Sequence, residues 1–227
     1  MLSRAVHARP LQLRRGVAAA VLALGAAAAQ AGAQVEEALA DSVRTALSAA
    51  IADGAPPTPA FQAFDDRMAY LRWLGVMGDK LKRRKNSFEV RQEFLGTVWY
   101  ESRRAGLDPA LVLGLIEVES AFRRYAVSRV GARGYMQVMP FWARSIGNGD
   151  ESSLFHMQTN LRFGCVILRH YLNREQGDLY LALGRYNGSR GRPEYPNAVF
   201  AARKRWQMPA QPARQQAQVE ARNPSHD

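Results

Sequence analysis

Glu119 is the side chain whose place in the sequence best suits acid–base chemistry. A helix is predicted over residues 109–121, and its apolar face carries Val112, Leu115 and Ile116. Glu119 continues the same spacing of three or four residues, so it belongs to that apolar face. The helix is therefore expected to place one carboxyl group against packed aliphatic side chains.

The Glu119 carboxyl has two interpretations. Packing against aliphatic groups disfavours the charged form of a carboxyl and raises its pKa. A general acid that works near neutral pH needs such a raised pKa. Alternatively, the helix end frays and Glu119 turns out to water. Glu117, two residues earlier, points largely away from the apolar face.

Two later segments contain residue types suited to an amide-bearing ligand. In Gly131–Pro140, two glycines three residues apart precede a Met-Gln-Val-Met run. Glycine lets a backbone approach a ligand closely, Gln137 can donate and accept toward an amide, and methionines form an adaptable apolar wall. Leu183–Gly188 ends a predicted helix with a tyrosine, an asparagine and a glycine. Each segment alone is more typical of a loop or a helix cap than of a binding site.

Composition excludes several classes of protein. The 227 residues include 47% hydrophobic residues, 31 Lys and Arg against 20 Asp and Glu, and a net charge of +11, which indicates a basic globular protein. Cys165 is the single cysteine, and apolar flanks predict that it is buried. A four-cysteine zinc site is excluded, and the scattered histidines and absent phosphate-loop motifs argue against metal and nucleotide enzymes. We expect no metal and no cofactor.

The elements that must position these residues are helices. Hydrophobic spacing and caps predict helices at 41–52, 61–84, 87–105, 109–121, 157–173, 177–186 and 195–207. Residues 135–138 are the one stretch suited to a short strand. We therefore expect an all-α protein with a helical N-terminal extension at 34–104, a catalytic domain at 105–207 and a disordered tail at 208–227.

Residues 1–33 have the parts of a secretory signal peptide. Arginines at the start precede an alanine-rich apolar run, and small residues alternate near Ala31 and Ala33. A retained membrane anchor is the alternative, although a spanning helix needs about 20 strongly apolar residues. We expect export to the periplasm or cell envelope of a bacterium.

A basic run, Lys80 to Lys85, has a separate set of interpretations. Clustered cations can hold a phosphate polymer, but export argues against a nucleic-acid partner. Anionic wall polymers, lipid head groups or peptide-stem carboxylates would suit the same charge. The simplest interpretation is a solvated helix end.

Together and in this order, the segments resemble the catalytic domain of the soluble lytic murein transglycosylases, which has a goose-lysozyme-like fold. The resemblance covers about residues 105–205. The matching residues are Glu119-Ser120, Gly131 to Pro140, Asn160 to Gly164 with Tyr171-Leu172, Leu183 to Gly188, and Tyr195-Pro196 with Val199. Many relatives have a Glu-Thr-x-x-Tyr stretch where this sequence has Gly191 to Tyr195, so that glutamate is lost or moved to Glu194.

The resemblance implies cleavage of the β-1,4 bond between N-acetylmuramic acid and N-acetylglucosamine, with a 1,6-anhydromuramic end and no added water. It implies Glu119 as sole acid and base, and Tyr186 as the group bonded to its carboxyl. The implied glycan-binding residues are Ser128, Gln137, Met139, Tyr186 and Asn187. The supporting residues are Ser120, Tyr135 and Met136. Candidates for stacking on sugar rings are Tyr135, Phe141, Trp142 and Tyr186, although Phe141 and Trp142 equally suit a core.

A mechanism with one carboxylate is consistent with the spacing of acids. Glycosidases usually pair two carboxyls about 5–5.5 Å or 6.5–9.5 Å apart, yet no Asp or Glu follows Glu119 until Asp150. The substrate's own acetamido and C6 hydroxyl groups would then act with Glu119. Glu175, Asp178 and Glu194 are the distant acids that could overturn this, but their helix flanks favour solvated charges.

The sequence therefore predicts an exported peptidoglycan lytic transglycosylase that binds glycan strands and no nucleic acid. Peripheral contact with an anionic wall or membrane surface is a further expectation, and the oligomeric state stays open. A hydrolytic lysozyme-type muramidase is one alternative. A non-catalytic glycan-binding or secretion-system assembly protein is another.

Overall fold

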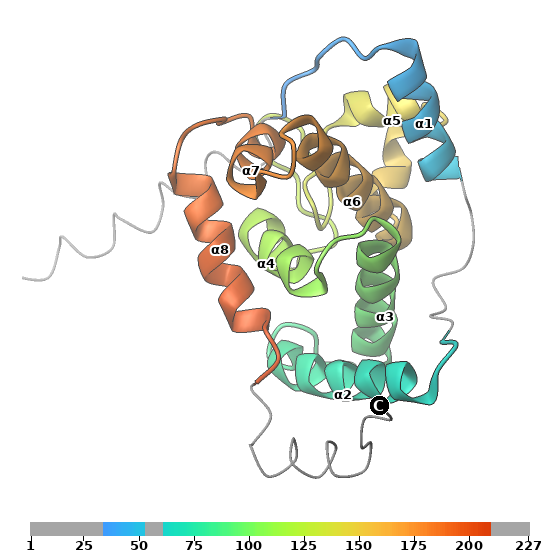
Figure 1. Ribbon diagram of the computed structural model, residues 1–227, viewed down its shortest axis with the longest axis vertical. Coiled ribbons are helices and arrows are strands. Elements are labelled where there is room, and N and C mark those ends of the chain that lie inside the picture. The colour runs from blue at the N-terminus through green and yellow to red at the C-terminus, as the bar shows by residue number, and fades with distance from the viewer. Residues whose placement is uncertain (1–33, 53–60, 210–227) are drawn as a thin grey trace, which may run out of the picture. The chain divides into compact units, whose positions relative to one another are not determined.

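Helix α4 (Pro109–Ser120) has ten of its twelve residues buried, a larger share than any other helix in the described part of the chain. Asp108 caps its start by accepting a hydrogen bond from the Ala110 N–H, and Pro109 occupies the first helical position. All eight residues from Pro109 to Ile116 are buried, and a helix that is apolar on all sides needs neighbours on all sides. Figure 1 shows α4 among α3, α6, α7 and α8.

The computed structural model describes residues 34–52 and 61–209, and the described part of the chain is all-α as predicted. In chain order the elements are α1 (Asp41–Ala52), α2 (Phe64–Leu81), α3 (Phe88–Arg104), α4, α5 (Pro140–Ile146), the 3-10 helix η2 (Glu151–Phe155), α6 (Met157–Arg174), α7 (Leu179–Asn187) and α8 (Glu194–Trp206). Each of the seven predicted helices has a counterpart among them.

The stretch between α4 and α6 differs from the prediction. The short helix α5 was not predicted; it starts where Pro140 takes the first helical position after Met139. The strand expected at 135–138 is wrong. The described residues there form a loop with two isolated bridges, both through Arg133, one to Val127 and one to Val138.

Helices α4 and α8 approach each other closely because Gly114 has no side chain. A Cβ atom placed at Gly114 would lie 2.6 Å from the main-chain nitrogen of Arg203. The Arg203 guanidinium also bonds to Asp108 at the start of α4, with Nε 2.8 Å from Oδ2. This close crossing fixes the position of α8, and with it the position of Tyr195 near its first turn.

Helix α3 is joined to α6 by a buried ion pair. Glu101 is 1% exposed and accepts hydrogen bonds from Nε and Nη2 of Arg162 at 3.1 and 2.8 Å. Cys165 lies nearby on α6 and is also 1% exposed, which confirms the predicted burial of the thiol. Burial raises the pKa of this thiol, so it packs as a small apolar group.

Two predicted segments fall largely outside the described residues. They are the signal segment at 1–33 and, except for Met208 and Pro209, the tail at 208–227. Among the helices of the described ranges, none has the length and apolar character needed to cross a membrane.

Replacing Gly114 with alanine is expected to destabilise the protein by about 1–3 kcal/mol, because the new methyl group meets the backbone of α8. Urea denaturation would measure the free energy of unfolding. Gly75→Ala is the matched control, since Gly75 lies at an exposed position of α2 with nothing within 4 Å of the added Cβ. That variant should be neutral or stabilised by about 0.5–1 kcal/mol. Equal effects at both positions would contradict the close-crossing explanation.

Candidate active site

Glu119 lies in the last turn of α4 and is 6% exposed. The aliphatic side chains predicted to share its face, Val112, Leu115 and Ile116, are fully buried. The chain reverses immediately after this turn, because Ala121 and Phe122 both adopt positive φ angles of 49° and 65°. The predicted burial of the carboxyl is confirmed, and the solvent-facing alternative is wrong.

The two oxygens of Glu119 have different surroundings. The Tyr195 hydroxyl donates to Oε1 at 2.5 Å. Oε2 is equally enclosed but has no hydrogen-bond partner among the described residues. Buried polar atoms are nearly always paired, so an unpaired one requires an explanation. One oxygen is held by the protein and the other is left for a different partner.

Burial raises the pKa of Glu119 from 4.5 to about 8, and the hydrogen bond from Tyr195 partly opposes this rise. At neutral pH the carboxyl is therefore mainly protonated. With Oε1 accepting from Tyr195, the proton belongs on Oε2. The Glu119 carboxyl is thus an acid whose proton-bearing oxygen, Oε2, has no hydrogen-bond partner among the described residues.

Glu117 occupies the opposite face, as predicted. Its carboxylate accepts from Arg84 at 2.8 Å and from the Trp206 indole N–H at 2.7 Å. These contacts tie α4 to the end of α2 and to the end of α8. Glu117 therefore has a structural role, and Glu119 is the only acidic residue on the inner side of this helix.

The loop after α4 is held in place by Asn160 of α6. The Asn160 Oδ1 accepts from the Met136 N–H, and Nδ2 donates to the carbonyls of Arg133 and Leu154, each at 2.8 Å. Gly134 has a φ of 77°, and an added Cβ would lie 2.3 Å from Asn160 Nδ2. The glycine is thus needed for the approach of a side chain, whereas the prediction was the approach of a ligand.

Gln137 is 2% exposed and has a positive φ of 48°. Its Nε2 donates to the carbonyls of Ala126 and Gly134 at 3.1 and 2.9 Å. Ser128 is half-buried, and its hydroxyl accepts from the Ala132 N–H at 3.1 Å. Both predicted glycan-binding side chains therefore also organise the loop in which they lie.

The predicted bond between Tyr186 and the Glu119 carboxyl is wrong. The Tyr186 hydroxyl donates to the Met136 carbonyl at 2.8 Å, while Tyr195 makes the bond to Glu119. Tyr186 is fully buried, and this burial is the main cause that raises its pKa, with a smaller contribution from the nearby Glu119 carboxyl. The two tyrosines share one buried cluster with Glu119, and the approach of α8 to α4 decides which hydroxyl reaches the carboxyl.

The other predicted site residues lie around this cluster. The Ser120 hydroxyl donates to the Tyr135 carbonyl at 2.7 Å and joins α4 to the loop. Met136 is fully buried and packs on Gly164, where a Cβ would lie 2.3 Å from its sulfur. Met139 is half-buried at the start of α5. Asn187 is 3% exposed, and its Oδ1 is enclosed with no partner among the described residues.

The four aromatic residues considered for sugar stacking are all buried. Tyr135, Phe141, Trp142 and Tyr186 are between 0% and 6% exposed. The Tyr135 hydroxyl accepts from Lys85 at 2.7 Å, and its ring packs against Phe94 with centroids 4.9 Å apart. These rings belong to the core, so stacking on a sugar by any of them is not supported.

The acids that could have served as a second carboxylate are engaged elsewhere or exposed. Glu175 is buried and paired with Arg185 and Arg190, which lower its pKa to about 2. The expectation of a solvated charge is wrong for this residue. Asp178 caps α7 by accepting from the Leu181 N–H, and Glu194 is exposed.

The basic run is mainly structural. The Lys80 ammonium donates to the carbonyls of Arg205 and Gln207 at 2.8 Å, next to the end of α8. Lys85 bonds to Tyr135, and Arg84 bonds to Glu117. Lys80 and Arg84 stay exposed despite these bonds, as do Lys82 and Arg83, so the interpretation as a solvated helix end is wrong only for the half-buried Lys85.

Comparison with known proteins agrees with this arrangement. Residues 97–208 match the family model of the transglycosylase SLT domain. The chain carries a transglycosylase SLT domain. The match begins within α3 and ends after α8, and it includes Glu119, Tyr195 and the loop between α4 and α5.

Individual relatives match about two fifths of the chain or slightly less. The membrane-bound lytic murein transglycosylase C of Glaesserella parasuis is 52% identical over 92 residues, which is 37% of this chain and 25% of that protein. Its namesake from Actinobacillus pleuropneumoniae is 40% identical over 89 residues, covering 35% of this chain and 24% of that protein. A transglycosylase of Enterobacteria phage PRD1 is 37% identical over 92 residues, covering 40% and 33%.

Among solved structures, an inactive mutant of the lytic transglycosylase Slt of Pseudomonas aeruginosa is 23% identical, with a TM-score of 0.40. That match covers 62% of this chain and 27% of the other. The chain thus spans between about a quarter and a third of the length of these relatives.

Two residues of the site were not predicted as such. Tyr195 was noted only as part of a motif, and Gln34 was not singled out. Gln34 is 4% exposed, and its carboxamide oxygen accepts from the Met139 N–H at 3.3 Å. The position of Tyr195 one residue into α8 could have suggested a role, but no local signal marks Gln34 because its partner is 105 residues away.

Tyr195→Phe is expected to raise the pKa of Glu119 above its value of about 8, because the lost hydrogen bond favours the charged carboxylate. An NMR titration of carboxyl-labelled glutamate would measure this shift. Tyr186→Phe is the matched control, since its hydroxyl bonds to the Met136 carbonyl and not to Glu119. An upward shift in the control alone would contradict the assigned bond.

Glu119→Gln is expected to make stability less dependent on pH. The folded carboxyl holds its proton up to about pH 8, whereas the unfolded one releases it near 4.5, so the wild type loses stability as pH rises between these values. Between pH 4 and pH 9, the free energy of unfolding of the variant should rise by on the order of 3 to 5 kcal/mol relative to that of the wild type. Urea denaturation across that range tests this, and a constant difference would contradict it.

Proposed function

We propose that this protein is an exported lytic transglycosylase that cleaves peptidoglycan glycan strands with Glu119 as its single acid and base. The enclosed carboxyl, with Oε1 bonded to Tyr195 and Oε2 without a partner among the described residues, is the observation that carries the proposal. The SLT domain and relatives named lytic murein transglycosylases support the reaction class. The envelope is the place where such a substrate is found.

Bond cleavage begins with the proton on Oε2 of Glu119. Donation of that proton to the glycosidic oxygen lets the N-acetylglucosamine side leave, while positive charge develops at C1 of the N-acetylmuramic residue. The acetamido oxygen of the same sugar stabilises this charge. Tyr195, still bonded to Oε1, stabilises the carboxylate that remains.

The second step returns the proton to Glu119. The carboxylate accepts the proton of the C6 hydroxyl, and the C6 oxygen attacks C1 to close the 1,6-anhydro ring. No water is consumed, and the carboxyl ends in its starting state. A pKa of about 8 suits both steps, since the group is protonated at rest and is still a competent base after donation.

The contacts of the other acidic side chains support a nucleophile from the substrate and not a second carboxylate of the protein. Glu175 is bound by two arginines, Asp178 caps a helix, and Glu151 is paired with Arg133 and Arg144. A retaining or inverting glycosidase would need such a group free beside the bond. Gln137, Ser128, Met139 and Asn187 are proposed to contact the glycan.

Digestion of peptidoglycan sacculi by the purified protein, followed by mass spectrometry of the muropeptides, tests this function. Anhydro ends are expected, and they differ from the reducing ends of a hydrolase by one water. Glu119→Gln should reduce turnover by several orders of magnitude, because the amide cannot donate the proton that the proposed first step requires. Circular dichroism would show that the variant stays folded.

Glu117→Gln is the matched control on the same helix, since its carboxylate faces Arg84 and Trp206. It should retain turnover in proportion to the folded protein. Reducing ends would favour a hydrolytic muramidase. Binding to sacculi with no turnover by the wild type would favour a non-catalytic glycan-binding protein.

A further inference from the structure

The segment before α1 reaches from the edge of the domain to the cluster around Glu119. Residues 34–40 have no helical structure, yet Gln34 is 4% exposed. Its carboxamide oxygen accepts from the Met139 N–H at 3.3 Å, and its Nε2 is enclosed with no hydrogen-bond partner among the described residues. Gln34 also lies close to Tyr186, which shares the buried cluster with Glu119. Gln34 is thus part of the candidate active site.

The group that Gln34 presents is a primary carboxamide. Its carbonyl is the same hydrogen-bond acceptor as the carbonyl of the acetamido groups on both sugars of the proposed substrate. The Met139 N–H points at that carbonyl from the start of α5, where no earlier turn of the helix can accept it. A single N–H serves one strong acceptor at a time, so Gln34 and a substrate amide compete for it.

We propose that residues 34–40 form an inhibitory strap in which Gln34 occupies the place of a substrate acetamido group. The inference rests on the proposed function of Glu119. Substrate must displace Gln34 from Met139 before it binds. The affinity for glycan is therefore lower with the strap in place than without it.

The strap is held by contacts that can be released. Glu37 pairs with Arg174 and Arg185, and the side chains of Glu37 and Arg174 are 34% and 42% exposed. The third side chain, Arg185, is 20% exposed, so the pairs lie at the edge of the protein, where salt weakens them. These pairs fix the strap to α6 and α7 without burying it.

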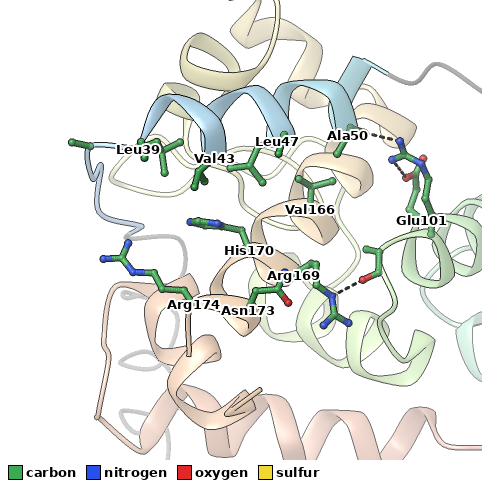
Figure 2. A pocket seen from close by; sticks show the side chains of 15 residues that line it. Leu39, Val43, Leu47, Ala50, Glu101, Val166, Arg169, His170, Asn173 and Arg174 are labelled. Carbon is green, nitrogen blue, oxygen red and sulfur yellow. Dashed lines mark hydrogen bonds and ion pairs between the residues drawn. The ribbon is translucent and has the colours of Figure 1, made fainter. Parts of the chain in front are cut away.

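The helix that follows the strap is also loosely seated. A cavity of about 830 Å³ lies between α1 and α6. Figure 2 shows Leu39, Val43 and Leu47 on its α1 side, with Val166 and His170 of α6 opposite. This space is open to solvent, and Leu47 is the only buried residue that α1 contributes, whereas ten of the twelve residues of α4 are buried. The strap and α1 can move away while the rest of the domain stays folded.

Gln34→Ala in the otherwise unchanged chain tests the strap. Loss of the competing hydrogen bond should lower the KM for soluble glycan strands about 3- to 10-fold, with kcat little changed. In a Glu119→Gln background, which cannot cleave, the same substitution should tighten binding of an N-acetylglucosamine tetramer by a similar factor in calorimetry. Gln62→Ala, at an exposed position before α2, is the matched control and should change neither value.

Glu37→Gln provides a second variant that leaves Gln34 intact. Loosening the strap should lower KM as well, but adding Glu37→Gln to Gln34→Ala should give no further decrease, because both act through the same contact. Independent, additive decreases would overturn the strap mechanism.

A higher KM or weaker tetramer binding for Gln34→Ala would make Gln34 a substrate contact and overturn the proposal. Unchanged values in an active enzyme would overturn it too, and would leave the proposed function standing. Failure of the wild type to cleave strands, together with failure of the Glu119→Gln protein to bind the tetramer, would instead remove the proposed function, and the inference with it.

Discussion

The site depends on keeping water away from one carboxyl group. Glu119 ends a helix that is buried on all sides, and the loss of water is the main cause of its raised pKa. The close crossing of α4 and α8 at Gly114 serves this purpose, because it carries Tyr195 to the carboxyl. The packing of α8 on α4 therefore controls the pKa of Glu119. A wider crossing would let water reach the carboxyl and would move the Tyr195 hydroxyl away from it.

The loop beside the carboxyl is ordered by side chains and not by a sheet. Asn160 binds three main-chain groups of this region, and Gln137, Ser120 and Tyr186 bind others. Such a network keeps the backbone N–H groups of the loop and of the start of α5 in fixed directions without strands. The Met139 N–H is one of these groups. Its fixed direction suits the Gln34 carbonyl and would suit a substrate carbonyl equally well.

Much of the fold could be predicted from the sequence because it depends on local signals. Apolar spacing, the Asp108-Pro109 start and the glycine stops placed seven helices near their observed bounds. The short helix α5 was not predicted because a seven-residue helix has too few turns to show a periodic spacing of apolar residues. The strand expected at 135–138 was wrong because its apolar residues are buried by a loop that Asn160 holds, and apolar alternation alone does not reveal that.

The sequence by itself determined that one glutamate sits on an apolar helix face, and that no acid follows it for thirty residues. Only the tertiary structure decided which tyrosine reaches that glutamate, which aromatic rings are core, and that Gln34 joins the site. These contacts link residues 50 to 105 positions apart. Spacing along a helix is fixed by its geometry, whereas contacts between distant segments depend on how whole helices pack.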